Sequence, residues 1–137
     1  RAMQIALAQA GLAPEQIQHL NAHATSTPVG DRGELAAIRT LFGAAIAAGQ
    51  GPAITATKSA IGHLLGAAGG AAAVFTVLAL QQQIVPPVLN LEQPDPLAEG
   101  MDLVRGAARP VAMAHALING FGFGGVNASL VLGRYQA

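Results

Sequence analysis

The stretch TKSAIGHLLGAAGGAAAVFTVLAL, residues 57–80, decides the fold. Its part from Leu64 to Leu80 carries no charge, and glycines at 62, 66 and 70 recur at four-residue spacing. This spacing fits the small-residue pattern of paired membrane helices, but the run is at the lower length limit for a membrane span and is mostly Ala and Gly. We therefore expect a long helix from about His63 to Gln82, buried in a soluble protein against a close neighbour, and no membrane partner.

On both sides of this helix the sequence predicts alternating helices and strands. A Gly-rich loop joins the last two strands, so they are most simply antiparallel, and helices between the other strands require a sheet covered on at least one face. The fold class is α/β with a mixed sheet in the order αβαβαββ, and residues 1–137 form one domain or part of one. The remaining predicted elements are a helix Ala2–Ala10, a strand Gln16–Ala22, a helix Asp31–Phe42 with Gly43 beyond its end, a strand Ala53–Thr57, an irregular stretch Pro86–Pro96, and strands Ala114–Asn119 and Ala128–Leu132.

Composition limits the possible functions. The chain is 52% hydrophobic and 10% charged, well below the roughly 25% charge of an average soluble domain, so much of its surface should be covered. A net charge of zero without a basic stripe argues against nucleic acid as a partner. There is no cysteine, which excludes disulfides and thiolate metal sites. The first residues show no signal-peptide pattern, so the default location is cytoplasmic.

Two motif matches are weak. Residues 120–125 fit the dinucleotide pattern G-x-G-x-x-G, but too few residues follow for the helix and strand that such a site needs. His19, His23, His63 and His115 lack the carboxylate or thiolate spacing of a zinc site. We expect no bound metal.

Two histidines lie at predicted ends of a helix and a strand, where catalytic groups are often found. His63 lies at or just before the predicted helix N-terminus, where the dipole keeps an imidazole neutral and able to donate. His23 ends a strand at a polar loop. Two such donors on one carbonyl oxygen would stabilise an enolate, and glycines 120–125 would let backbone N–H groups approach a substrate. The alternative is a buried strand-end His23, a helix-capping His63 and a tight hairpin.

Four segments resemble the C-terminal half of the elongating β-ketoacyl-[acyl-carrier-protein] synthases of the type II kind, in the same order and at similar spacing over Ala2–Leu132. The resemblance implies the thiolase-like fold, in which two αβαβαββ halves form a five-layered α-β-α-β-α domain that dimerises. This chain would be the second half. The segments are NAHATSTPVGD (21–31), TKSAIGHLLGAAGG (57–70), VPPVLNLEQPDP (85–96) and NGFGFGGVNASLVL (119–132).

The resemblance also implies an activity. In this family an acyl group sits on a cysteine, malonyl-acyl carrier protein decarboxylates, and the carbanion attacks the acyl carbonyl to give 3-oxoacyl-acyl carrier protein in fatty-acid elongation. His23 and His63 would stabilise the enolate, and Lys58, the only lysine, would support His63. The enzyme would need no cofactor of its own, because 4′-phosphopantetheine arrives on the carrier protein.

Further residues take their roles from the same resemblance. Phe123 matches the gating phenylalanine whose backbone N–H completes the oxyanion hole, and Gly122 and Gly124 beside it would border the substrate. Thr25 and Thr27 match the threonines that hydrogen-bond the pantetheine arm. The nucleophilic cysteine would lie in an N-terminal half of the same enzyme, which would work as a homodimer in the cytoplasm, or in an organelle if eukaryotic.

The chain departs from the family at three positions. Ala72 stands where most members carry Glu, so Lys58 lacks its expected carboxylate partner; modular polyketide ketosynthases lack this Glu as well. Gly120 replaces a usual Ser and Val126 a usual Thr. A polyketide ketosynthase and a non-catalytic dimerisation or scaffold half therefore remain as alternatives, and the chain alone should be inactive.

Overall fold

The computed structural model describes residues 1–135 and shows a four-stranded mixed sheet in the order β2-β1-β5-β6. Strand β1 (His19–Asn21) pairs in parallel with both β2 (Ala53–Thr55) and β5 (His115–Phe121). The final strand, β6 (Asn127–Gly133), is antiparallel to β5. The predicted αβαβαββ order and the mixed sheet are confirmed.

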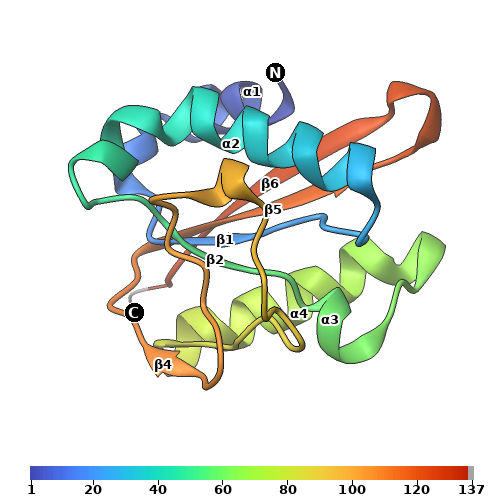
Figure 1. The fold of residues 1–137 in the computed structure, drawn as a ribbon. Coiled ribbons are helices and arrows are strands. Elements are labelled where there is room, and N and C mark those ends of the chain that lie inside the picture. The colour runs from blue at the N-terminus through green and yellow to red at the C-terminus, as the bar shows by residue number, and fades with distance from the viewer. Residues whose placement is uncertain (136–137) are drawn as a thin grey trace.

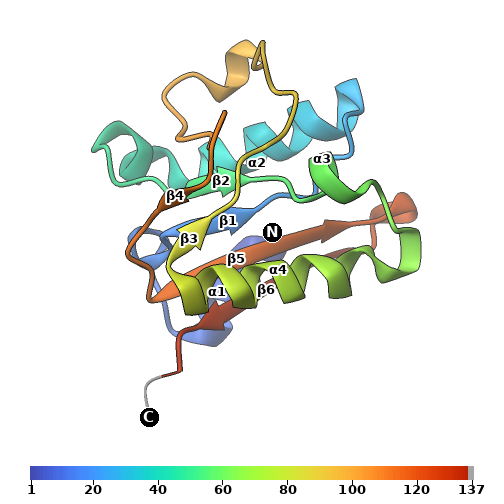
Figure 2. The same cartoon turned by 90° about the horizontal axis from the view of Figure 1, so that it is seen from below.

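Helices cover both faces of this sheet (Figures 1 and 2). Helices α1 (Ala2–Ala10) and α2 (Pro28–Ala47) lie on one face, and α4 (Ala68–Gln82) lies on the other. Because side chains alternate along a strand, each strand supplies both layers of core. On the α1 and α2 side the core includes Met3, Leu7, Leu20, Phe42 and Leu117, and on the α4 side Ala53, Leu80, Val104, Met113 and Ala116.

The helix boundaries follow from local sequence. Helix α1 ends at Ala10, and the φ of 66° at Gly11 turns the chain so that the N–H of Leu12 donates to the carbonyl of Leu7. Helix α2 begins earlier than predicted, because Pro28 is well suited to a first helical position. It also continues through Gly43 to Ala47. Glycine inside a helix costs only about 1 kcal/mol, and burial of Ala45 beyond it offsets that cost.

Two predicted strands are shorter than expected. The stretch 16–22 begins in a 3₁₀ turn, η1 (Pro14–Gln16), and only residues 19–21 pair in the sheet. Strand β2 stops at Thr55, and Thr57 instead precedes a short helix, α3 (Lys58–Ile61). Both strands are buried at every position, so hydrophobicity alone does not mark their ends.

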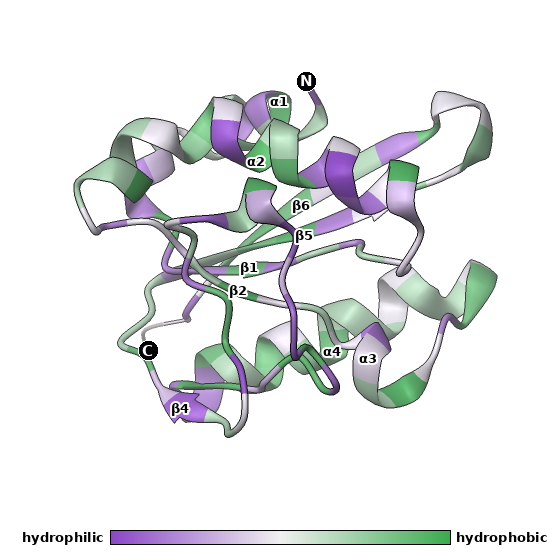
Figure 3. Cartoon of the chain, in the orientation of Figure 1, coloured by the Kyte–Doolittle hydropathy of each residue, from purple (hydrophilic) through white to green (hydrophobic). Residues whose placement is uncertain are grey.

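The long apolar helix differs most from its prediction. It begins at Ala68, after a break at residues 62–64 and a 3₁₀ turn, η2 (Leu65–Ala67). The window Leu65–Gln82 is long and apolar enough to cross a membrane by length and composition, yet only 22% of it is buried. Figure 3 shows apolar residues along α4 and the loop before it. The exposed apolar side chains of α4 are Val74, Phe75, Val77 and Leu78.

The stretch Pro86–Pro96 is irregular, as predicted, and the segment between α4 and β5 that contains it is held in place at several points. Strands β3 (Ile84–Val85) and β4 (Arg109–Pro110) form a two-stranded antiparallel sheet. The 3₁₀ turn η3 (Pro96–Ala98) lies over α2, where Arg39 Nη2 donates to the carbonyls of Leu97 at 2.7 Å and Glu99 at 2.6 Å. A last 3₁₀ turn, η4 (Phe123–Gly125), lies between β5 and β6.

Candidate active site

The predicted site residues follow the carboxyl ends of three parallel strands. His23 lies just beyond β1, Lys58 beyond β2, and the loop 122–125 beyond β5. Strands that pair in parallel end at the same edge of a sheet, which is where open α/β sheets bind ligands. In Figure 1 this edge is at the right, where the start of α2, helix α3 and the tip of the β5–β6 hairpin gather.

The two histidines meet at this edge. The ring centroids of His23 and His63 are 5.8 Å apart, and the ring planes are perpendicular. The two rings therefore lie together, and the shared cavity and the catalytic roles expected of them stay predictions. Two imidazoles at this separation are close enough to address one small group, such as a thioester oxygen, from two directions.

His63 is held by a backbone hydrogen bond and does not start the helix. It lies in the break between α3 and η2, where its Nδ1 accepts the N–H of Leu65 at 3.2 Å. Because Nδ1 accepts, the neutral ring carries its proton on Nε2, which is then a donor. Leu65 has a φ of 50°, a left-handed conformation that leucine rarely adopts, and this turn presents its N–H to the ring.

His23 lies in an environment that disfavours its charged form. Burial lowers its pKa most, and electrostatic interactions with Lys58 and His63 lower the pKa further, whereas Asp31 raises it. Its Nδ1 is buried without a hydrogen-bond partner among the described residues. An imidazole whose pKa lies below its ordinary 6.5 is neutral at pH 7 and keeps one N–H to donate.

Lys58 is half-buried at the first position of α3. Burial lowers the pKa of its ammonium group, and the charge of Glu34 raises it. Within residues 1–135 Lys58 makes no ion pair shorter than 4 Å. Its charge therefore acts on His23 through space, as the lowered pKa of His23 indicates.

Glu34 is a site residue that the sequence analysis missed. Its buried carboxylate accepts the backbone N–H groups of His23, at 2.9 Å, and Ala24, at 2.8 Å. It also accepts the side-chain amide of Asn119 on β5 at 2.9 Å. The spacing of Glu34 in the sequence could have revealed it, because residue 34 shares the buried face of α2 with Ile38 and Phe42. A carboxylate on a buried helix face needs hydrogen-bond partners.

Asn21 is, like Glu34, a buried polar residue, and it lies on β1, two residues before His23. Its Nδ2 donates to Thr76 Oγ1 at 3.1 Å and to Thr57 Oγ1 at 3.3 Å. It also lies 3.4 Å from the carbonyl oxygen of Ala72. These bonds join β1, the start of α3 and α4, so the segments that carry His23 and Lys58 are fixed to one another. Ala72 itself is buried and offers Lys58 no carboxylate.

The glycine loop borders the histidines through Phe121. The Phe121 ring lies 5.7 Å from the His23 ring, whereas Phe123 is fully exposed. The N–H of Gly122 donates to the carbonyl of Val126 at 2.8 Å, so this N–H is not free for a substrate. Gly124 has a φ of 77°, which closes the turn. The predicted loop lies next to His23, but the aromatic ring that faces His23 is that of Phe121 and not that of Phe123.

Thr25 and Thr27 lie on the loop that joins His23 to α2. Their hydroxyl oxygens are 3.2 Å apart, and either can donate to the other. The intervening Ser26 has a φ of 60°. This left-handed turn lets the two threonines on either side of it meet.

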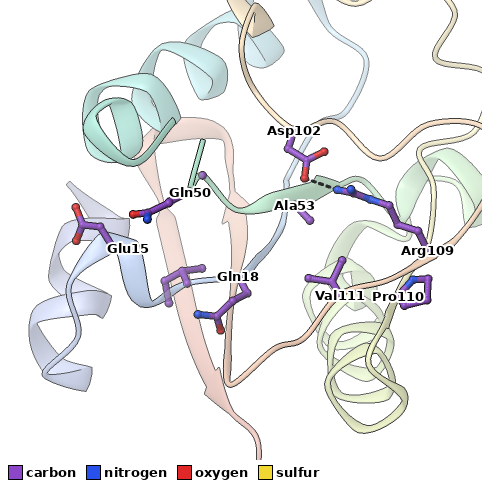
Figure 4. Close-up of a pocket in the computed structure, with 10 residues that line it drawn as sticks. Glu15, Gln18, Gln50, Ala53, Asp102, Arg109, Pro110 and Val111 are labelled. Atoms are coloured by element: carbon purple, nitrogen blue, oxygen red, sulfur yellow. Dashed lines mark hydrogen bonds and ion pairs between the residues drawn. The ribbon is translucent and has the colours of Figure 1, made fainter. Parts of the chain in front are cut away.

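Two hollows of the surface lie away from the predicted site residues. One, of about 580 Å³, is at the amino ends of β1 and β2 and is open to solvent (Figure 4). Asp102 and Arg109, two of the residues that line it, form an ion pair. Another, of about 640 Å³, lies along residues 94–105. No predicted site residue lines either of them. No three His, Asp or Glu side chains in residues 1–135 are placed to hold a metal ion.

Comparison with known proteins points to one family for the chain. Residues 1–92 match the family described as "Beta-ketoacyl synthase, C-terminal domain". The 3-oxoacyl-[acyl-carrier-protein] synthase 2 of Mycobacterium tuberculosis is 48% identical over 130 residues, which is 95% of this chain and 30% of that protein. The mitochondrial 3-oxoacyl-[acyl-carrier-protein] synthase of Arabidopsis thaliana is 45% identical over 95% of this chain and 28% of its own length.

Solved structures give the same result. A β-ketoacyl synthase from Burkholderia phymatum superposes with a TM-score of 0.89 at 37% identity, over 98% of this chain and 31% of the other. A type II polyketide ketosynthase, solved in complex with its acyl-carrier protein, superposes with a TM-score of 0.87 at 29% identity over 98% and 32%. The fold is the thiolase-like fold of ketosynthases. The chain spans about a third of the length of these relatives.

Proposed function

Because the chain belongs to the family of β-ketoacyl synthase C-terminal domains, we propose that it is the C-terminal part of an elongating 3-oxoacyl-[acyl-carrier-protein] synthase. The observation that carries this proposal is the pair of histidine rings at 5.8 Å, with His63 Nδ1 occupied by the N–H of Leu65. This arrangement lets each of the two rings offer an N–H donor to a group placed between them. The relatives named 3-oxoacyl-[acyl-carrier-protein] synthase 2 support the assignment to fatty-acid elongation.

The proposed reaction is a decarboxylative Claisen condensation. The carbon–carbon bond to the malonyl carboxylate breaks, and carbon dioxide leaves. The electron pair of the broken bond stays on the malonyl thioester and forms an enolate. His23 and His63 donate hydrogen bonds to the enolate oxygen, and burial, with a smaller contribution from the charge of Lys58, favours the neutral form of His23. The enolate carbon then attacks an acyl thioester held on a cysteine outside this chain. The carbon–sulfur bond breaks, and the cysteine thiolate leaves.

The substrates arrive on acyl carrier protein. Because the 4′-phosphopantetheine arm comes with the carrier protein, the enzyme would need no cofactor or metal of its own. The arm would pass Thr25 and Thr27, whose paired hydroxyls lie on the loop beside His23. Phe123, fully exposed at the hairpin tip, would close on the acyl group when the rest of the enzyme is present, and Gly122 and Gly124 would let the tip move. The solved complex of a related ketosynthase with its carrier protein supports this partner.

The rest of the enzyme would cover the exposed apolar face of α4. That face includes Val74 and Phe75, and an uncovered apolar helix face of this size is unusual for a protein that works alone. We infer an N-terminal part that supplies the cysteine and packs on α4, and a homodimer of the whole. Such an enzyme would bind neither nucleic acid nor membrane and would work in the cytoplasm or, in a eukaryote, in an organelle.

A polyketide ketosynthase is the second candidate. Ala72, where fatty-acid enzymes usually carry Glu, and the similarity to a polyketide ketosynthase structure favour it. The higher identity to the fatty-acid enzymes favours the first candidate. The two share their chemistry and differ in the acyl chain, so a comparison of saturated acyl and 3-oxoacyl carrier-protein substrates would separate them.

The proposal is tested with the full-length enzyme that carries this chain. It should condense acyl and malonyl thioesters of acyl carrier protein, whereas the 137-residue chain alone should be silent, because covalent catalysis requires the thiolate. His63→Ala should reduce malonyl-carrier protein decarboxylation by about a hundredfold, the usual effect of removing one oxyanion donor. Acylation of the cysteine should survive.

His115→Ala is the matched control. This histidine lies at the other end of β5, where its Nδ1 is 3.3 Å from the carbonyl of Gln16, and its loss should leave decarboxylation near the parental rate. Equal rates for the His63→Ala and parental enzymes would refute the enolate-stabilising role and make His63 a residue of the turn alone.

A further inference from the structure

The Thr27 hydroxyl does not do what its position predicts. Thr27 is the N-cap residue of α2, where a threonine side chain ordinarily accepts a backbone N–H of the first turn. Here it makes no capping hydrogen bond, and its Oγ1 instead lies 3.2 Å from Thr25 Oγ1. In such a pair one hydroxyl donates to the other, so one hydroxyl hydrogen has no acceptor among the described residues.

Gly30 provides the space for this arrangement. A Cβ built on Gly30 would lie 2.5 Å from Thr27 Oγ1, a contact that real Cβ atoms do not make. The next nearest atoms are Thr25 Oγ1 at 3.8 Å and Thr27 Cβ at 3.9 Å. The conflict is therefore with the hydroxyl alone. Gly30 lies within helix α2, and its φ is outside the left-handed range, so the backbone there does not itself require glycine.

We propose that Gly30 is a positioning residue for the carrier arm, because its missing side chain keeps the Thr27 hydroxyl turned toward Thr25. This inference rests on the proposed function, in which the threonine pair binds the amide groups of the 4′-phosphopantetheine arm. A methyl group at position 30 forces Thr27 into another rotamer, which carries the hydroxyl away from its partner. The arm then loses one hydrogen bond, while the histidines are untouched.

The test compares Gly30→Ala with Gly33→Ala in the full-length enzyme. Both positions lie on α2, but a Cβ on Gly33 meets no atom within 4 Å. Alanine favours helix at both positions, so neither change should lower the thermal unfolding midpoint. Gly30→Ala should raise KM for malonyl-carrier protein about three- to tenfold with kcat nearly unchanged, the effect of one net hydrogen bond. Gly33→Ala should leave KM unchanged.

A double-mutant cycle with Thr27→Ala identifies the atom responsible. Thr27→Ala should raise KM by a similar factor, and adding Gly30→Ala to it should have no further effect, because the clashing oxygen is gone. Equal KM values for the Gly30→Ala and Gly33→Ala enzymes, or additive effects in the cycle, would overturn the inference alone. A parental enzyme without condensing activity would overturn the proposed function, and this inference with it.

Discussion

Glu34 Oε1 accepts the backbone N–H of His23 at 2.9 Å, so a carboxylate on α2 fixes a residue that lies just beyond the end of β1. The same oxygen accepts from Asn119 on β5, and the other oxygen accepts from Ala24. One buried side chain thus sets the exit of the chain from the sheet at the point where the histidine pair forms. We therefore expect the arrangement of the two histidines to depend on this carboxylate.

Replacing Glu34 with Gln should test this dependence. The amide has nearly the same shape, but its NH₂ group must face a backbone N–H, so one buried donor loses its acceptor. We expect a loss of roughly 1.5–3 kcal/mol in the free energy of unfolding, typical of a hydrogen bond to a charged group. Urea denaturation measures it, and the exposed Glu15→Gln is the control. An unchanged midpoint for Glu34→Gln would contradict the anchoring role.

The pKa of His23 should depend on Lys58. Burial lowers this pKa most, and the Lys58 charge lowers it further, so Lys58→Met should raise it. The neutral form of His23 would then be lost at a higher pH, and the acidic limb of the rate profile for decarboxylation should move to higher pH. Arg105→Met removes an exposed cation elsewhere and should leave the limb in place. A limb that does not move in Lys58→Met would exclude this coupling.

How much of this site the sequence predicts differs from residue to residue. His23, Lys58 and the glycine loop follow predicted strands, and the parallel pairing of β1 with β2 and β5 brings them together. Glu34 and Asn21 were missed, because their roles come from tertiary hydrogen bonds, and neither the charge nor the hydropathy of a residue reveals such partners.

The predicted start of helix α4 was wrong for a local reason. Leu65 takes a left-handed backbone conformation inside an apolar run, and hydrophobic periodicity does not register a single such residue. The start of α4 was therefore placed at His63. In the structure His63 lies in the break before the helix, and this break turns its ring toward His23.

His19 should make the protein sensitive to acid. It is fully buried on β1, its Nδ1 donates to the carbonyl of Ala53 at 2.9 Å, and burial lowers its pKa. Below pH 6.5 the unfolded chain binds a proton that folded His19 does not, so stability is complete above pH 6.5 and falls as pH decreases. The slope should approach about 1.4 kcal/mol per pH unit. His19→Met should flatten it in urea titrations between pH 7.5 and 5, and an identical slope in both proteins would contradict this assignment.

The apolar face of α4 should make the 137-residue chain associate when it is produced alone. Val74 and Leu78 are 58% and 41% exposed and lie one turn apart on the helix, so they form a continuous apolar strip. Such a strip, with no covering partner, favours contact between copies. We expect sedimentation velocity to show species larger than the monomer.

Lysine at both positions should return the chain to the monomer, since each ammonium group opposes burial of the strip. Ala36→Lys with Thr40→Lys gives the same charge and spacing on the exposed face of α2, and this control should associate like the parent. In the full-length enzyme Val74→Lys with Leu78→Lys should impair folding or activity, because the strip would then be covered. Association that is equal in both double variants would show that another surface joins the copies.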